Sequence, residues 1–290
     1  MTAPNHARLT LRRVPAMQGW AWVRGGLSLL LANPAPIHLG LMFLFAALLL
    51  SAALPLLGVI LPALLMPVLY VGLMNVIEAT QAVQTNQTLD PNLARQQKLR
   101  AFTAMITVFQ DFDRVRRLML LGAAYALAVL AMMGLSALFD DGFMFRHLLL
   151  GEALPKTDEA KAQLLNGLLF VLPLYAPVSL IFWFAPQLVG LHGQGILKAL
   201  FFSGLGCWRN LRAFAVYAVT WVLVFMLMNV LLFFVVGLLG SALGLGVAMV
   251  ASVFLVTWLY CSFYVSYLSL VQVTPAQDSD SNPDSNSNLT

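Results

Sequence analysis

The chain contains one long stretch, residues 213–277, without a single Asp, Glu, Lys or Arg. Such a stretch can cross a bilayer more than once, since about 20 apolar residues make one helical span. The whole chain shares this character, with 60% hydrophobic and only 10% charged residues, whereas a soluble domain carries about 25% charged residues. A water-soluble fold would lack the polar surface to cover itself, so the sequence predicts an integral membrane protein.

Six apolar segments have the length of a membrane span: residues 37–54, 56–79, 118–139, 164–184, 214–239 and 243–270. We expect helices, because lipid offers no partner to an exposed backbone and the segments lack the alternation of barrel strands. The predicted fold class is therefore all-α, a polytopic membrane protein with six transmembrane helices. The first span begins late, after four arginines, so we expect no cleavable signal peptide.

The lysines and arginines are distributed unevenly between the two sides of these spans. Thirteen of the 16 lie before the first span or in the second and fourth connections, and the other three are Arg146, Lys156 and Lys161 in the third. By the positive-inside rule both termini are cytoplasmic. The basic residues form no continuous stripe, so we expect no nucleic-acid partner.

The division into segments follows from these spans. Residues 1–36 form a cytoplasmic N-terminal segment with an interfacial helix, and residues 37–271 form a six-helix transmembrane domain. Residues 272–290 form a polar, low-complexity tail that we expect to be disordered, because it cannot bury a core.

Apolar residues mixed with basic ones precede the first, third and fifth spans. Read as one helix at 100° per residue, residues 195–212 bring Lys198, Arg209 and Arg212 within ~60° of one another. Trp208 belongs to the apolar side of this helix, and such a pattern is typical of a helix lying in the membrane interface. Residues 17–30 and 99–109 resemble it, so we predict three cytoplasmic interfacial helices and a threefold repeat of interfacial helix, outward span and returning span.

Nine residues in these three regions are candidate membrane-interface anchors: Trp20, Arg24, Arg114, Arg116, Arg117, Lys198, Trp208, Arg209 and Arg212. A basic residue close to an anionic leaflet contributes about 1 kcal/mol to membrane binding. The predicted partners are therefore the lipid bilayer and its anionic phospholipid headgroups. Asp113 and Arg117 have the i,i+4 spacing of an ion pair on a helix surface.

The stretch 182–217 contains Trp-Phe-Ala-Pro (residues 183–186), Lys-Ala-Leu-Phe-Phe-Ser (198–203) and Arg-Asn-x-Arg-Ala-Phe (209–214). These motifs resemble the pattern of a family of uncharacterised proteobacterial inner-membrane proteins named after a Burkholderia hypothetical protein. The opening "RRVPAMQGWAWVRGGLSLLLANP" and "VGLM" (71–74) are similar to it as well. The resemblance implies a six-span protein of the bacterial inner membrane, and it implies no activity, ligand or catalytic residue.

Four polar residues in or beside the spans are candidates for a polar path: Asn75, Glu78, Tyr175 and Asn229. The alternatives are a headgroup-level carboxylate for Glu78 and interhelical hydrogen bonding, contributing about 0.6–2 kcal/mol, for Asn229. Prolines interrupt the second and fourth spans, at positions 62, 67, 173 and 177. Broken helices mark substrate sites in transporters, but proline is also a common packing kink in membrane helices.

The sequence suggests no catalytic residue, metal site or cofactor. It contains no P-loop, nucleophile elbow or nucleophile–base pair. The nearest approach to a metal-ligand cluster is His147 beside Asp140 and Asp141, which a solvated loop explains equally well. Cys207 and Cys261 lack the spacing of a redox or metal motif and are expected to be inert.

Two functions are favoured, and a third, an intramembrane enzyme, is the weakest because no nucleophile–base pair can be named. The first is a non-enzymatic scaffold or accessory protein of the cell envelope with a protein partner, favoured by the absent chemistry and the interfacial helices. The second is a small transporter or lipid-handling protein for a neutral or amphiphilic substrate, favoured by the proline-interrupted spans.

Overall fold

The computed structural model describes residues 8–32, 34–53, 60–86, 103–149, 152 and 157–274. Its elements in chain order are β1 (Arg8–Leu11), α1 (Gln18–Ala32), α2 (Pro34–Ala52), α3 (Ile60–Asn86), the 3₁₀ helix η1 (Val108–Gln110), α5 (Phe112–Asp140), the π-helical turn η2 (Phe145–Leu149), α6 (Asp158–Phe182), α7 (Ala185–Gly190), α8 (Ile196–Arg209), α9 (Leu211–Leu239), α10 (Ser241–Leu270) and β2 (Val271–Thr274). The predicted all-α polytopic fold is confirmed.

Within the described residues, five helical segments are long and apolar enough to cross a membrane: Leu61–Ala82, Phe112–Asp140, Asp158–Gly190, Leu211–Leu239 and Ala242–Leu270. A sixth span is counted if α1 and α2 are taken as one broken span, bent by 101°. The bend separates α1 as a short helix of its own. The protein is therefore a multi-pass membrane protein.

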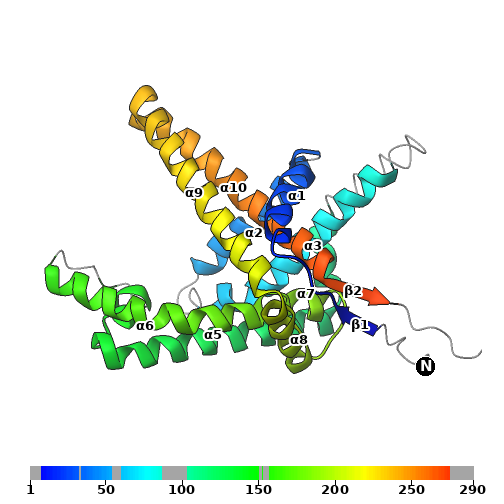
Figure 1. The fold of residues 1–290 in the computed structure, drawn as a ribbon, viewed down its shortest axis with the longest axis horizontal. Coiled ribbons are helices and arrows are strands. Elements are labelled where there is room, and N and C mark those ends of the chain that lie inside the picture. The colour runs from blue at the N-terminus through cyan, green and yellow to red at the C-terminus, as the bar shows by residue number, and fades with distance from the viewer. Residues whose placement is uncertain are drawn as a thin grey trace, which may run out of the picture.

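The long helices form three consecutive pairs, α2 with α3, α5 with α6, and α9 with α10. The second and third pairs diverge from a common base, where α7, α8 and the two strands lie (Figure 1). Within the described ranges α3 packs along α5, whereas α6 and α9 make at most marginal contact. The molecule is consequently open between its second and third helix pairs.

The short helices connect neighbouring pairs. η1 contacts α3 and α5, α8 packs on α6, and α1 packs on α10 and α9. Each short helix thus packs on the second helix of the preceding pair: η1 on α3 and α8 on α6. α1, which precedes the first pair, packs on the second helix of the last pair, α10. This is the contact order expected of the predicted threefold repeat, which stays a prediction.

Two glycines let α1 approach the last helix pair closely. A Cβ at Gly19 would lie 2.2 Å from the carbonyl oxygen of Ala213 in α9, and one at Gly26 would lie 2.5 Å from the backbone nitrogen of Ser262 in α10. Real Cβ atoms are not found at such distances from backbone atoms. Only glycine allows this packing, which buries Trp22 between the helices.

Both ends of the described chain meet in a small antiparallel sheet (Figure 1). β1 pairs with β2 from Arg8 opposite Thr274 to Leu11 opposite Val271, and the Arg12 N–H donates to the carbonyl of Leu270 at 2.9 Å. Residues 272–274, which the sequence assigned to a disordered tail, are therefore in a strand. The rest of that predicted tail, residues 275–290, lies outside the described residues.

Two details of the sequence prediction are wrong. Residues 195–212 are not one helix, because α8 ends at Arg209 and α9 begins at Leu211, with Asn210 in a non-helical conformation between them. The third span begins earlier than residue 118, since the Asp111 carboxylate caps α5 by accepting from the Arg114 N–H at 3.0 Å. Asp111 also forms the ion pair, at 3.6 Å from the Arg114 guanidinium, in place of the Asp113–Arg117 pair.

Candidate functional site

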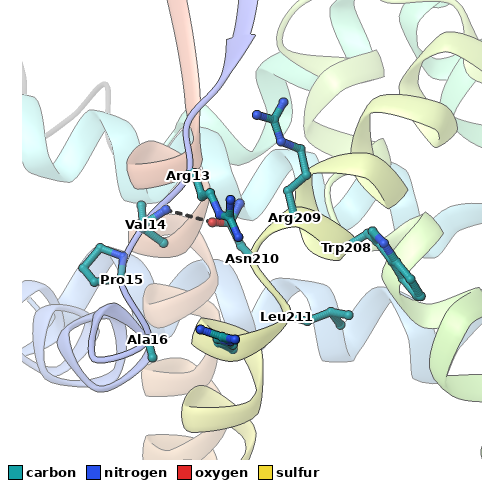
Figure 2. Close-up of a pocket in the computed structure, with 9 residues that line it drawn as sticks. Arg13, Val14, Pro15, Ala16, Trp208, Arg209, Asn210 and Leu211 are labelled. Carbon is teal, nitrogen blue, oxygen red and sulfur yellow. Dashed lines mark hydrogen bonds between the residues drawn. The ribbon is translucent and has the colours of Figure 1, made fainter.

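A crevice of about 310 Å³ lies where the N-terminal segment crosses the junction of α8 and α9 (Figure 2). We call it the arginine crevice, and its lining residues are Arg13, Val14, Pro15, Ala16, Trp208, Arg209, Asn210, Leu211 and Arg212. Three guanidinium groups and no carboxylate belong to this lining. Arginine stays charged at all relevant pH values and matches phosphate or carboxylate with a planar fork of donors. The crevice can therefore hold an anion.

Asn210 builds the crevice by holding its two walls together. Its side chain is only 3% exposed. The amide oxygen accepts from the Val14 N–H at 2.9 Å, as Figure 2 shows, and the amide nitrogen donates to the carbonyls of Arg12 at 3.1 Å and Gly206 at 2.8 Å. One buried side chain thus fixes the N-terminal segment against the end of α8. Arg13, Arg209 and Arg212 surround it and are exposed.

α8 presents two different faces. Its buried face consists of the small residues Ala199, Ser203, Gly206 and Cys207. Its outer face carries apolar side chains, with Leu197 83%, Phe201 65% and Trp208 69% exposed. Lys198 and Arg209 are exposed on the same helix. An exposed apolar face bordered by basic residues is the pattern of a helix in the membrane interface.

The other predicted anchors lie in two further places. Trp20 and Arg24 are exposed on α1. Arg114, Arg116 and Arg117 lie in the first turns of α5, with Arg116 exposed and Arg117 partly buried. These residues do not line the arginine crevice, so of the nine candidate anchors only Trp208, Arg209 and Arg212 meet there.

A second cavity, of about 500 Å³, opens among the long helices. We call it the tyrosine groove. α3, α5, α6, α7 and α10 form most of its wall, and its lining includes Pro67, Tyr70, Tyr125, Tyr175, Ser179, Trp183 and Tyr260. Its size is that of a small-molecule site, since such pockets enclose about 300–1,000 Å³.

Neutral hydrogen-bonding groups provide the polarity of the tyrosine groove. The Tyr125 and Tyr175 hydroxyls are 3.1 Å apart, and the Gln187 amide nitrogen donates to the Tyr70 hydroxyl at 2.5 Å. The indole N–H of Trp183 and the amide oxygen of Gln187 are buried without a hydrogen-bond partner. Of these two residues only Trp183 lines the groove. Buried polar groups are nearly always paired in folded proteins, so the Trp183 N–H marks a place where a ligand acceptor would be favourable.

The predicted polar path is not assembled. Tyr175 lines the tyrosine groove, but Asn75, Glu78 and Asn229 do not. Asn75 donates to the Thr107 hydroxyl at 3.2 Å, and Asn229 donates to the Phe225 carbonyl of its own helix while facing outward. Glu78 is exposed near the end of α3.

The histidine and acidic residues of the third connection serve local structure. Asp140 is 1% exposed and accepts from the N–H groups of Gly142 and Met144 at 3.0 and 3.1 Å. The His147 ring bonds the Glu152 carbonyl at 3.0 Å, and Asp141 ends α5. No group of three His, Cys, Asp or Glu side chains suited to a metal is found among the residues whose placement is known.

Cys207 is fully buried in α8. Burial raises the pKa of this thiol, because the thiolate would lose its hydration.

Sequence reasoning missed most of the tyrosine groove. Tyr70, Tyr125 and Trp183 look like ordinary span residues, because their approach depends on the break between α6 and α7 and on contacts between distant helices. The one available signal was the pair of prolines in the second span, both of which line the groove.

A protein of Burkholderia thailandensis described as a probable inner membrane protein is similar to this chain. The two are 35% identical over 265 residues, which cover 89% of this chain and 93% of the relative. No protein-family model matches the chain, and no solved structure is similar to it.

Proposed function

Because the chain belongs to the same family as this Burkholderia inner membrane protein, and is itself a multi-pass membrane protein, we propose that it is a non-enzymatic accessory protein of the cell envelope. Its docking surface would be the arginine crevice together with the outer face of α8. The observation that carries the proposal is the crevice itself, whose lining carries three exposed arginines on two segments that one buried asparagine holds together.

The first step of this function is binding of an anionic phospholipid headgroup. The lining of the crevice has three positive charges and no negative one. Trp208 in this lining, and Leu197 and Phe201 further along the outer face of α8, suit the depth at which headgroups meet acyl chains. A phosphate bound there would be approached by guanidinium groups from both the N-terminal segment and the start of α9.

We further propose that this surface faces the cytoplasm. Thirteen of the 16 lysines and arginines belong to the side that the positive-inside rule assigns to it. Pairing of β1 with β2 supports a common side for both ends of the described chain, which meet within one small sheet. A partner protein would thus find the basic crevice, α8 and both chain ends on one surface.

The lipid step is tested by native mass spectrometry of the detergent-purified protein, titrated with phosphatidylglycerol or phosphatidylcholine. Near an anionic leaflet each basic residue contributes about 1 kcal/mol, so Arg209→Ala/Arg212→Ala should weaken phosphatidylglycerol binding about 30-fold. The matched control is Arg146→Ala, an arginine of the third connection outside the crevice. Equal affinity of wild type and the double variant, or equal binding of phosphatidylcholine, would refute a headgroup site.

The accessory role is tested by crosslinking in native membranes followed by mass spectrometry. A specific protein partner found with wild type and lost in Arg209→Ala/Arg212→Ala is expected. Capture of lipids alone would count against docking of a partner.

A second candidate function, the handling of a neutral amphiphile, is favoured by the tyrosine groove. The groove combines a mostly apolar wall with uncharged hydrogen-bonding groups and lies among membrane-spanning helices. α3, which runs unbroken through both of its prolines, contributes Pro62 and Pro67 to it.

A further inference from the structure

The lining of the tyrosine groove includes an exposed side chain at mid-span, which is the depth of the bilayer interior. Tyr175 is 40% exposed and lies near the middle of the span Asp158–Gly190. Figure 1 shows that the α5–α6 pair and the α9–α10 pair diverge from a common base. At this depth the surrounding solvent is acyl chain.

The end of α6 shapes one wall of the groove. α6 stops at Phe182 and α7 begins at Ala185, with Pro186 in its first turn. The backbone freed by this break is satisfied, since the Phe184 N–H donates to the Ser203 hydroxyl at 2.9 Å and that hydroxyl donates to the Leu180 carbonyl at 3.1 Å. The break is therefore stable without a ligand, and it leaves Trp183 at the wall of the groove.

Among the residues that line the groove, hydrogen-bond donors without a partner outnumber acceptors without one. The indole N–H of Trp183 can only donate and has no partner. Of the Tyr125 and Tyr175 hydroxyls, one donates to the other, which leaves the second O–H unused, and the Tyr70 hydroxyl accepts from Gln187 while its own O–H stays available. No charged side chain belongs to the described lining. The complementary ligand is therefore apolar and uncharged at this point and carries an acceptor such as a carbonyl oxygen.

We propose that the tyrosine groove is a binding site for one acyl chain of a membrane ester lipid, whose ester carbonyl accepts a hydrogen bond from the Trp183 indole. The chain occupies the apolar wall between α3, α6 and α10. This proposal deepens the second candidate function and is independent of the arginine crevice, because the two linings share no residue.

The test uses the full-length protein in nanodiscs that contain phosphatidylcholine with a diazirine on one acyl chain. After irradiation, labelled peptides are mapped by mass spectrometry. Ser179→Trp fills the groove with a bulky ring, and Leu169→Trp is the matched control, since Leu169 is on the same helix, 64% exposed, and outside the groove. Ser179→Trp should reduce labelling of groove peptides about threefold or more, because the ring occupies the space of the chain.

The carbonyl contact is tested with an ether-linked analogue of the same probe. Wild type should label more strongly with the ester than with the ether probe, by about fivefold for one hydrogen bond. Trp183→Phe keeps an aromatic ring against Phe214 and Phe263 but removes the donor, so this preference should disappear. The readout needs no knowledge of activity, and comparable insertion of every variant is checked by its yield and monodispersity in detergent.

Three results would overturn the proposal: labelling of the groove no stronger than that of the outer face of α6, labelling unaffected by Ser179→Trp, or displacement of the probe by an isoprenoid benzoquinone and not by unlabelled phosphatidylcholine. Arg209→Ala/Arg212→Ala should leave groove labelling unchanged. The lipid titration therefore tests the headgroup site, and the photolabelling tests the acyl-chain site, so that either proposal can fail without the other.

Discussion

Asn210→Ala should detach the N-terminal segment from the α8–α9 junction. The substitution removes three hydrogen bonds of a side chain that is 3% exposed, those to Val14, Arg12 and Gly206. Two of these bonds, those to Val14 and Arg12, join the segment to the junction, whereas Gly206 belongs to α8 itself. Each bond contributes about 0.5–1.5 kcal/mol net, so the expected loss is about 1–3 kcal/mol in the free energy that holds the segment. Part of this loss comes from the Val14 N–H and the Arg12 carbonyl, which are left without a partner.

Limited trypsin digestion in mild detergent measures this opening locally, because Arg12 and Arg13 are cleavage sites next to the lost contacts. About 1.4 kcal/mol corresponds to a tenfold change in the open population, so a loss of about 1–3 kcal/mol should accelerate cleavage at these sites about 5- to 140-fold. The control is Asn229→Ala in α9, where the amide bonds only its own helix and faces outward. Equal cleavage of the two variants would refute the role given to Asn210.

Two further predictions concern the packing of α1 and the connection after α7. Gly26→Val should lower the melting temperature measured by tryptophan fluorescence by several degrees, because its Cβ would lie 2.5 Å from the Ser262 nitrogen. The control Gly237→Val should leave the melting temperature unchanged, because a Cβ there meets nothing within 4 Å. Equal effects of the two substitutions would contradict the close approach of α1 to α10. Burial lowers the pKa of His192 below its ordinary value of 6.5, so the unfolded chain binds the proton more tightly and the stability of the fold should decrease as the pH drops through 6.5. A His192→Gln variant should lose that pH dependence. The same pH profile in wild type and variant would contradict this role of His192.

The secondary structure was largely predictable from hydrophobicity. The uncharged stretch after Arg212 had to form two spans, and Gly240 ends the first of them in a turn with φ of 81°. Helix ends that depend on a side-chain hydrogen bond to a distant segment were harder to predict from the sequence. Asn210 interrupts what reads as one amphipathic helix because its amide bonds a segment some 200 residues away, and no local pattern carries that information.

The candidate sites were predictable to different degrees. Arg209, Arg212 and Trp208 stand out in sequence, because charge and an aromatic residue at the edge of an apolar run already indicate an interface. Arg13 was recognised only as one of many basic residues, since its approach to α8 depends on β1 pairing with β2. The tyrosine groove depends on five elements meeting, so single-residue polarity pointed instead to Asn75 and Asn229, which lie elsewhere.

The contacts of α1 impose an order on biosynthesis. α1 leaves the ribosome before its native neighbours α9 and α10, and β1 pairs with the strand that follows α10. Early in translation α1 therefore has none of these partners, and its packing face stays uncovered until α9 and α10 have been made. Formation of these contacts thus joins an early and a late part of the described chain. A polypeptide truncated before α10 would keep Gly26 and Trp22 uncovered, which gives membrane proteases a direct means of distinguishing incomplete chains from finished ones.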